Sequence, residues 1–409
     1  MKFNFSQAIK TLEEWVQIKS VKSTASEGAP FGIEIKRMLE KALLDASNMG
    51  FETKNYDGYI GEVIFGEGDD SDGIAILCHL DVVPEGDLSR WSFSPYSLTE
   101  KDGFLYGRGV LDDKGATVVC LYALKSLKDE GYIPSRKIKL IFGLDEESGW
   151  GCIDHYNKVA VMPKTGFSPD GEFPVLYAEK GIYHIKYAFD KNSDIEVLSG
   201  GDRINVVCDK TRIKLKGKRA IVFKGVSAHG STPEQGDNAI KKALKYLVKK
   251  GLFNESDYEN LFSGRLFEKI KDESGRLTFS PNVINIEKDK IIISVDVRYP
   301  VHYTLQEVEK TLRKVGVFEL ISHHKPLYQD KSGELVTTLN GVYEEYTGTK
   351  CKPTTTGGGT YARALKNGVA FGPATAGEEC CHEPNERISL KSLEQCFYIY
   401  KEAIKRLSK

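Results

Sequence analysis

The chain has 409 residues, of which 40% are hydrophobic and 28% charged, and its formal net charge is −1. This composition is typical of a water-soluble globular protein that is long enough for two domains with separate cores. The basic residues are spread along the sequence and no apolar run is long enough to span a membrane, so we expect neither a nucleic-acid partner nor a membrane partner.

The N-terminal segment and the cysteines point to a cytoplasmic protein. Residues 1–20 have apolar residues at helical spacing with polar residues between them, which predicts an amphipathic helix and not a signal peptide. The eight cysteines form no C-x-x-C pair, and several lie in apolar runs, so we expect reduced thiols. Cys380 and Cys381 adjoin His382, which leaves a thiolate metal ligand as a minor alternative.

The first part of the chain alternates helices and strands. Helical spacing continues from Gly32 to Met49, and strands are predicted at 61–65 and 74–78. A helix predicted from Gly115 to Asp129 precedes a further strand at 137–144. A strand, a helix and a second strand in this order indicate a parallel sheet that is covered on both faces.

The pattern changes after residue 170. Residues 181–215 and 220–225 alternate like half-exposed strands, and a helix at 238–250, a strand at 291–297 and a helix at 305–315 follow. This pattern predicts a smaller α+β unit inserted into the α/β domain. We therefore predict a two-domain α/β protein with a mostly parallel sheet in domain segments 1–181 and 326–409, an inserted domain at 182–325, and a last helix at 390–407.

Acidic residues and histidines recur where apolar segments end. His79 and Asp81 follow the buried run 74–78, and ligands of open α/β sheets bind at the carboxyl ends of the strands. The alternative is a core histidine held by a neighbouring aspartate. Other chemically active residues also lie at the ends of apolar segments or in tight loops: Asp112, Asp113, Glu146, Glu147, Asp170 and His382.

This set is large enough for two metal ions. Two divalent ions that share one bridging carboxylate need about three protein ligands each, drawn from His, Asp and Glu when the metal is zinc or manganese. Glu146 and Glu147 are adjacent at a strand end, so their side chains point in different directions. One can bind a metal while the other faces a water molecule, although a solvated acidic pair is the simpler explanation of two adjacent glutamates.

The motifs resemble those of a known enzyme group, the di-zinc aminoacylase and carboxypeptidase superfamily, from about residue 10 to the C-terminus. This superfamily includes carnosinases, succinyl-diaminopimelate desuccinylases and bacterial Xaa-His dipeptidases. The resemblance lies in three motifs in order: His79-Leu80-Asp81-Val82-Val83-Pro84, then Tyr106-Gly107-Arg108-Gly109 leading to Asp112-Asp113-Lys114-Gly115, then Asp145-Glu146-Glu147-Ser148-Gly149.

The resemblance implies a centre of two Zn²⁺ ions, with Mn²⁺ or Co²⁺ as alternatives. One ion would be held by His79, Asp112 and Asp170, and the other by Asp112, Glu147 and His382, so that Asp112 is the bridge. Glu146 would be the general base that takes a proton from the bridging water, and Asp81 would orient His79. In the superfamily the peptide bond between Asp112 and Asp113 is cis.

Two further segments are most similar to the Xaa-His dipeptidase branch. The first is Ser168-Pro169-Asp170-Gly171-Glu172-Phe173-Pro174, and the second is Gly357-Gly358-Gly359-Thr360-Tyr361-Ala362-Arg363. Gly358, Gly359 and Thr360 would let backbone N–H groups approach a bound anion closely, whereas the alternative is a plain flexible turn.

The inserted domain resembles the lid of this superfamily. His229, in Gly225-Val226-Ser227-Ala228-His229-Gly230-Ser231, would donate to the scissile carbonyl oxygen as negative charge develops there. Asn205 and Arg298 match lid positions that hold the terminal carboxylate of a dipeptide. A planar guanidinium pairs with a carboxylate through two hydrogen bonds, although a solvated arginine at a strand end is the alternative.

We therefore predict a metal-dependent dipeptidase that hydrolyses unblocked dipeptides, its small peptide substrates, through a water that bridges two zinc ions, and that is a monomer or homodimer. The nearest alternative is an N-acyl amino acid deacylase such as a succinyl-diaminopimelate desuccinylase, which uses the same chemistry with a different acyl pocket. A non-catalytic peptide or amino-acid binder is a third alternative, but such a protein is expected to have lost the base or a metal ligand. Here Glu146 and all five ligand positions are filled.

Overall fold

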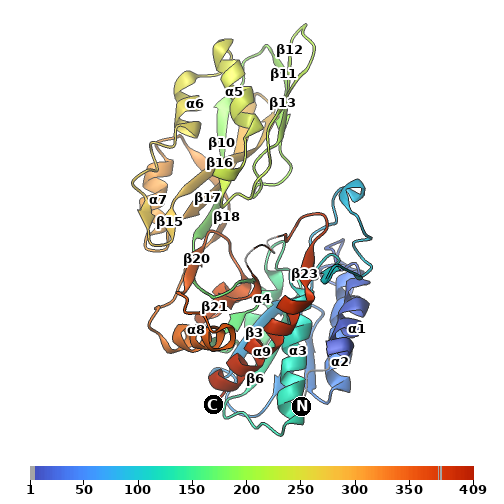
Figure 1. The fold of residues 1–409 in the computed structure, drawn as a ribbon. Coiled ribbons are helices and arrows are strands. Elements are labelled where there is room, and N and C mark those ends of the chain that lie inside the picture. The colour runs from blue at the N-terminus through green and yellow to red at the C-terminus, as the bar shows by residue number, and fades with distance from the viewer. Residues whose placement is uncertain (1–4, 376, 378–379) are drawn as a thin grey trace. The chain divides into compact units, whose positions relative to one another are not determined.

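A computed structural model describes residues 5–375, 377 and 380–409, and it separates the chain into two compact units. Unit 1 consists of Met1–Tyr177, Gln329–Thr354 and Thr360–Lys409. Unit 2 consists of Ala178–Tyr328 and Thr355–Gly359. Figure 1 shows both units as ribbons.

The centre of unit 1 is a parallel sheet. Strands β6 (Ile138–Gly143), β3 (Ile74–His79), β7 (Thr165–Ser168) and β21 (Asn367–Phe371) lie next to one another in this order, all parallel. Strands β1 (Glu52–Tyr56) and β2 (Ile60–Phe65) extend the sheet antiparallel beside β6. On the other side, β21, β9 (Val175–Glu179) and β19 (Leu327–Tyr328) pair antiparallel, and β20 (Thr354–Thr356) pairs with β9. The predicted parallel sheet is thus confirmed for the central strands, while the flanking pairs are antiparallel.

Helices cover both faces of this sheet, as the continuous apolar strands predict. Every residue of β3 and β6 is buried. On β2, Gly61 faces Leu39 and Leu43 of α2, whereas the next residue, Glu62, accepts a hydrogen bond from Tyr156 of α4. Since successive side chains of a strand point to opposite faces, α2 and α4 lie on opposite sides of the sheet.

The helices of unit 1 include α3 and α9, which pack side by side (Figure 1). The predicted last helix is confirmed with its bounds, residues 390–407. The helices of this unit are α1 (Phe5–Val16), α2 (Ile33–Asn48), α3 (Lys114–Asp129), α4 (Gly151–Val159), α8 (Glu334–Thr347) and α9 (Leu390–Leu407), with 3-10 turns η1 (Leu88–Arg90) and η3 (Tyr361–Ala364). A small sheet has the strand order β23 (Arg387–Ser389), β5 (Phe104–Tyr106) and β4 (Thr99–Lys101). A separate two-stranded sheet consists of β8 (Gly171–Glu172) and β22 (Pro373–Ala374).

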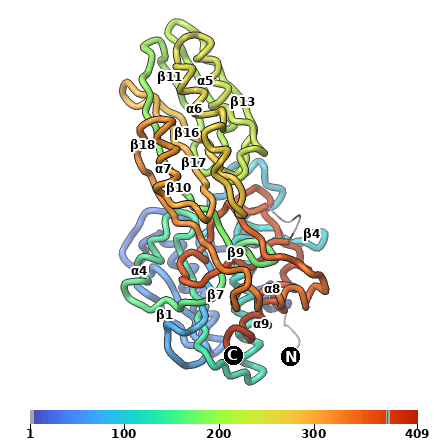
Figure 2. Tube along the Cα trace, turned by 90° about the vertical axis from the view of Figure 1, so that its left-hand side faces the viewer, coloured from blue at the N-terminus to red at the C-terminus, as the bar shows by residue number. Residues whose placement is uncertain are grey.

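Unit 2 is an antiparallel sheet with helices packed against it (Figure 2). The strand order is β13 (Ile221–Lys224), β12 (Lys210–Leu215), β11 (Ile195–Gly200), β16 (Thr278–Glu287), β17 (Lys290–Tyr299), β10 (Gly181–Asp190) and β18 (Phe318–His324). Helices α5 (Ala239–Lys249), α6 (Glu255–Phe262) and α7 (Leu305–Leu312) contribute apolar residues to its core. The unit also contains η2 (Pro233–Gln235) and the short strands β14 (Lys271–Asp272) and β15 (Gly275–Arg276).

The elements that the sequence did not reveal have weak local patterns. β16 contains Pro281 and two asparagines, which are depleted in strands, and the register of β16 shifts at Pro281. α6 is short and mostly polar. The antiparallel pair β4 and β5, within residues 91–106, was also not predicted.

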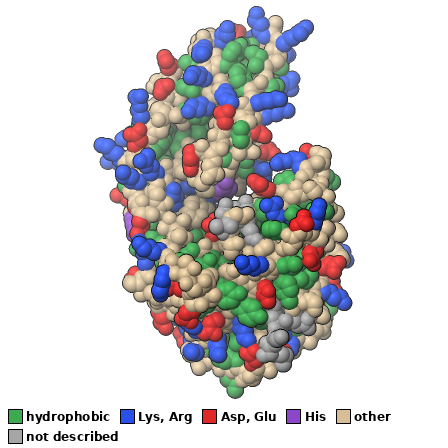
Figure 3. Space-filling view, in the orientation of Figure 1, with side chains coloured by type: hydrophobic (Ala, Val, Ile, Leu, Met, Phe, Trp, Pro, Cys, Tyr) green, Lys and Arg blue, Asp and Glu red, His purple; other side chains and the backbone are tan. Residues whose placement is uncertain are grey.

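Basic side chains are not spread evenly over unit 2. Figure 3 shows Lys and Arg gathered around the end that carries α5, whereas acidic and basic side chains are mixed over unit 1. The exposed basic residues of this region are Lys210, Arg212, Lys216, Lys218, Arg219, Lys224, Lys241, Lys242, Lys245, Lys249 and Lys250. Basic residues that are spread along the sequence thus gather on the surface here, because β12, β13 and α5 bring two sequence segments together.

In the part of the chain that the structure describes, every helix is too short or too polar to cross a bilayer.

Candidate metal centre

The parallel strands bring the predicted residues to one edge of the unit 1 sheet. His79 is the last residue of β3, Glu146 and Glu147 follow β6, and Asp170 follows β7. Because these three strands are adjacent and parallel, their carboxyl ends meet at the same edge. Asp112 is added by the loop before α3, and its peptide bond to Asp113 is cis.

Asp112 lies between two histidines. Its Oδ1 is 2.9 Å from Nε2 of His79, and its Oδ2 is 3.0 Å from Nε2 of His382. Each histidine also faces a second carboxylate: His79 Nε2 lies 3.9 Å from Asp170, and His382 Nε2 lies 2.8 Å from Glu147. The carboxylate of Asp112 thus directs one oxygen at His79 and the other at His382. This is the arrangement of a carboxylate that bridges two metal ions.

The donor atoms form two clusters suited to metal ions. Within the described residues, His79, Glu146 and Asp170 form one cluster, and Asp112, Glu147 and His382 form the other. In each cluster the possible ligand atoms lie within 4.8 Å of one another. Neither Cys380 nor Cys381 belongs to a cluster found among these residues, and Cys380 Sγ instead contacts the backbone of Arg387.

The His79 ring has the orientation of a metal ligand. Its Nδ1 lies 3.0 Å from the backbone oxygen of Asp81, so Nδ1 carries the proton of a neutral ring and donates it there. Nε2 then carries a buried lone pair that is directed at carboxylate oxygens and has no hydrogen-bond partner among the residues that the structure describes. A cation between Nε2 and these oxygens satisfies both sides, so the residues fit a divalent metal.

The electrostatics of the centre are those of crowded carboxylates. Burial raises the pKa of Glu146 well above its ordinary value, and the charge of Asp170 adds to this effect. Burial also raises the pKa of Glu147. Burial opposes a charged Asp112, but the adjacent His382 and His79 rings outweigh it and hold its pKa far below the ordinary value.

The histidines respond in the opposite direction. Burial disfavours the charged form of both rings. Contacts with Asp112 and Asp81 outweigh burial at His79, and contacts with Glu147 and Asp112 outweigh it at His382. Both pKa values are therefore raised well above the ordinary value. The cluster therefore attracts positive charge, which bound metal ions supply.

Asp81 acts through two different groups. Its backbone oxygen accepts the Nδ1–H of His79, while its carboxylate is 3.6 Å from that nitrogen. The carboxylate instead accepts the backbone N–H groups of Glu146 at 3.2 Å and Glu147 at 3.1 Å. Asp81 thus links the end of β3 to the acidic pair after β6, a contact that the sequence did not predict.

Tyr361 is a further buried residue beside the centre. Its hydroxyl accepts the backbone N–H of Asp145 at 3.3 Å and lies 2.8 Å from Sγ of Cys152. Its ring meets the His79 ring edge-on, at 6.2 Å between centroids. The sequence marked Tyr361 only as part of a glycine-rich motif, and nothing local indicated its contact with the strand end.

The substrate-binding residues predicted in unit 2 also come together. Val206 and His229 form a β-bridge, and the Gly230 N–H donates to Asn205 O at 2.7 Å. Arg298 is buried: its Nε and Nη2 donate to Asp296 at 2.7 and 2.9 Å, and its Nη1 donates to the Gly357 backbone oxygen at 3.2 Å. The side chain is therefore fixed in place and is not a solvated strand-end arginine.

His229 and the glycine-rich segment have local partners of their own. The exposed His229 ring lies 2.6 Å from the Ser231 hydroxyl through Nδ1. The Gly358 N–H donates to the Thr356 hydroxyl at 3.0 Å, and the Thr360 hydroxyl accepts the N–H of Ala362 as the cap of η3. Gly359, between them, is half-buried.

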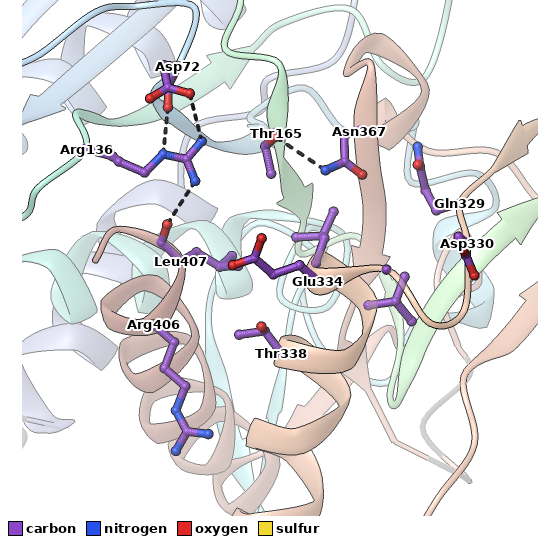
Figure 4. Close-up of a pocket in the computed structure, with 13 residues that line it drawn as sticks. Asp72, Arg136, Thr165, Gln329, Asp330, Glu334, Thr338, Asn367, Arg406 and Leu407 are labelled. Carbon is purple, nitrogen blue, oxygen red and sulfur yellow. Dashed lines mark hydrogen bonds and ion pairs between the residues drawn. The ribbon is translucent and has the colours of Figure 1, made fainter.

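A hollow in unit 1 lies at the opposite edge of the sheet (Figure 4). It measures about 490 Å³ and is lined by Thr165 and Asn367, the first residues of β7 and β21. Its main polar groups are already paired: Asn367 donates to Thr165, and Arg136 donates to the backbone oxygens of Asp72 and Leu407. The chemistry therefore resides at the carboxyl ends of the strands and not in this hollow.

Comparisons with known proteins identify the family of this chain. Residues 75–406 match the family described as Peptidase family M20/M25/M40. The Bacillus subtilis protein named "Putative dipeptidase YtjP" is 34% identical, with 98% of this chain and 97% of that protein covered. A Staphylococcus epidermidis protein named "Putative dipeptidase" is 33% identical, with 98% and 96% covered.

Solved structures share the fold at low sequence identity. Human carnosine dipeptidase 1 has a TM-score of 0.67 at 15% identity, with 99% of this chain and 96% of that chain covered. The aminoacylhistidine dipeptidase of Vibrio alginolyticus has a TM-score of 0.62 at 14% identity, with 100% and 98% covered. These likenesses confirm the predicted two-domain metallopeptidase fold, and the family match implies a divalent metal cofactor. The chain is a member of peptidase family M20/M25/M40 and thus a hydrolase.

Proposed function

We propose that this protein is a dipeptidase that hydrolyses unblocked dipeptides with two divalent metal ions, Zn²⁺ in the first instance, bound at the edge of the unit 1 sheet. The observation that carries the proposal is the position of Asp112, with one carboxylate oxygen facing each of two histidines. The names of the relatives at 34% and 33% identity support a dipeptide substrate.

The ligands follow from this arrangement. His79, Asp112 and Asp170 would hold one ion, and Asp112, Glu147 and His382 the other. When bound, such ions lower the pKa of a coordinated water and polarise the scissile carbonyl.

Glu146 is the proposed general base. It lies in the cluster of His79 and Asp170, and its backbone is held by the Asp81 carboxylate. In the proposed reaction its carboxylate takes a proton from the attacking water and passes it to the leaving amine.

Unit 2 supplies the proposed substrate-binding residues. His229 would donate to the carbonyl oxygen on which negative charge develops, and Asn205 and Arg298 would hold the terminal carboxylate. The gathering of these residues in one part of unit 2 supports this assignment. Gly358, Gly359 and Thr360 are proposed to line the same subsite with backbone groups. We further propose that the protein is cytoplasmic and works as a monomer or homodimer.

The proposal is tested with a panel of substrates after metal removal and reconstitution. The purified protein is treated with a chelator, and Zn²⁺, Mn²⁺ or Co²⁺ is added back. Unblocked dipeptides, N-acetyl amino acids and N-succinyl amino acids are then compared by kcat/KM. Preference for unblocked dipeptides is the expected result. Preference for the N-acyl compounds would replace the proposal with a deacylase, and the lack of any turnover with every metal would overturn it.

A further inference from the structure

A buried ion pair lies beside the metal centre without belonging to it. Arg108 Nη1 donates to Glu386 Oε2 at 2.7 Å, and their side chains are only 2% and 1% exposed. The pairing of β5 with β23 brings the two residues together, since Tyr106 is opposite Arg387. Neither residue belongs to the two clusters of possible ligand atoms found among the described residues, so the pair is not itself a set of candidate ligands.

The second oxygen of Glu386 organises the loop that ends in Asp112. Oε1 accepts backbone N–H groups from Gly109 at 3.0 Å, Leu111 at 3.0 Å and Asp112 at 3.2 Å. Three donors that converge on one oxygen restrict the rotation of the backbone that carries the bridging ligand. Hydrogen bonds to a charged acceptor are stronger than those to a neutral one, so the charge of Glu386 matters as well as its shape.

Arg108 extends the same restraint to the other ligand segments. Its Nη1 also lies 3.4 Å from the backbone oxygen of Glu383, the residue after His382. Its Nη2 donates to the backbone oxygen of Pro84 at 3.3 Å, in the segment that follows His79 and Asp81. The guanidinium stacks over the Trp91 ring at 5.2 Å, which fixes its plane.

We propose that Arg108 and Glu386 are positioning residues that set the distance between Asp112 and the two histidines before any metal binds. The segments that carry His79, Asp112 and His382 are far apart in the sequence, and this pair has hydrogen bonds to all three. A bridging carboxylate is useful only when both of its oxygens are correctly placed, so the pair acts on metal affinity. This inference rests on the proposed two-metal function.

The chain offers a matched control in the same unit. Lys139 and Glu62 form a second buried ion pair at 2.9 Å, with side chains 2% and 0% exposed. It joins β6 to β2 and contacts Asp70 and Tyr156, not the metal centre. Glu62→Gln removes a buried charge of the same kind, so it reports the general cost of disturbing such a pair.

The experiment measures Zn²⁺ binding to the metal-free full-length protein by calorimetry with a competing chelator. Glu386→Gln is expected to weaken the binding of at least one ion about 10- to 100-fold, the range found when the partners of metal ligands are replaced. Excess Zn²⁺ should restore most of kcat, with KM for the dipeptide unchanged. Glu62→Gln should lower the melting temperature but leave Zn²⁺ affinity within about twofold of the natural protein.

Two results would overturn the inference: unchanged Zn²⁺ affinity in Glu386→Gln, or an equal loss in Glu62→Gln. If Glu386→Gln does not fold, Arg108→Lys replaces it, because lysine keeps the charge beside Glu386 but cannot reach Pro84 and Glu383 together. Arg108→Lys is expected to weaken Zn²⁺ binding several-fold, and wild-type affinity would contradict the inference. If the natural protein itself binds neither Zn²⁺ nor Mn²⁺, the proposed two-metal function is wrong as well. If the natural protein binds Zn²⁺ and Glu386→Gln binds it equally tightly, only the role of the ion pair is wrong.

Discussion

The carboxylate of Asp81 accepts the backbone N–H of Glu147 at 3.1 Å. Its other oxygen accepts the N–H of Glu146 at 3.2 Å, so one buried side chain fixes the backbone of both the proposed base and a proposed ligand. A carboxylate accepts on both oxygens, whereas a side-chain amide accepts on its one oxygen and donates from its NH₂ group.

The first prediction follows from that difference. Asp81→Asn places an NH₂ group against a backbone N–H, and a buried donor without an acceptor costs about 1–3 kcal/mol. We expect kcat to fall about 10- to 100-fold through the displaced acidic pair. Asp69→Asn is the control, because Asp69 also accepts two backbone N–H groups but is exposed and distant from the centre. Equal kinetics in Asp81→Asn and the natural protein would contradict the role of this contact.

The second prediction concerns Glu146. Glu146→Gln has the same shape but cannot take a proton, so we expect nearly all turnover to be lost while metal content and melting temperature are retained. Metal analysis of the purified variant, together with its kcat, checks this. A variant with substantial kcat would move the base to another residue.

The third prediction concerns metal and stability. A ligand that binds only the folded protein stabilises it by about 2.7 kcal/mol at 100 times its Kd. Zn²⁺ should therefore raise the melting temperature of the metal-free protein. The rise should be much smaller in Asp112→Asn, because an amide is a weaker ligand and cannot bridge through two charged oxygens. An equal rise in both proteins would place the bound metal elsewhere.

The fourth prediction concerns Arg298. Lysine keeps the charge next to Asp296 but loses the planar fork that pairs with a carboxylate. Arg298→Lys should raise KM for a free dipeptide clearly more than for the same dipeptide with a C-terminal amide. Equal effects on the two substrates would refute the carboxylate assignment and favour the deacylase alternative.

The fifth prediction concerns the pH dependence of stability. Burial alone would raise the pKa of Asp296, but the charge of Arg298 and the contact with His184 outweigh it and lower that pKa from 3.8 to about 2. A lowered carboxyl pKa stabilises the folded state above pH 3.8, and this contribution is lost as the pH falls towards 2. It amounts to roughly 2 kcal/mol near neutral pH.

Asp296→Asn removes this contribution. The difference in free energy of unfolding between the natural protein and Asp296→Asn should therefore be largest at pH 7 and smaller at pH 3, as measured by urea titration. Asp190→Asn is the control, because Asp190 is paired with Lys290 at a fully solvated site and should show little effect at either pH. A difference that does not change with pH would show that the Asp296 charge contributes nothing to stability.

The sequence by itself determined the elements with strong local patterns. The mostly apolar, fully buried runs of β3 and β6 and the regular spacing of α9 were predicted within a residue or so of their observed bounds. The proposed metal ligands were named from motifs that resemble those of the superfamily, and the structure brings these residues together in two adjacent clusters. β16 and α6 were missed because their prolines, asparagines and acidic residues weaken the periodicity on which such predictions depend.

Only the tertiary structure decided how these residues are held. Glu386 contacts the backbone of Asp112 across 274 positions of sequence, and Tyr361 contacts Asp145 across 216. Asp81 uses its backbone for His79 and its carboxylate for the acidic pair, a division that no spacing reveals. Local periodicity reports which face of an element is buried, but such contacts depend on which strand ends and loops become neighbours, and that is fixed by the packing of the whole unit.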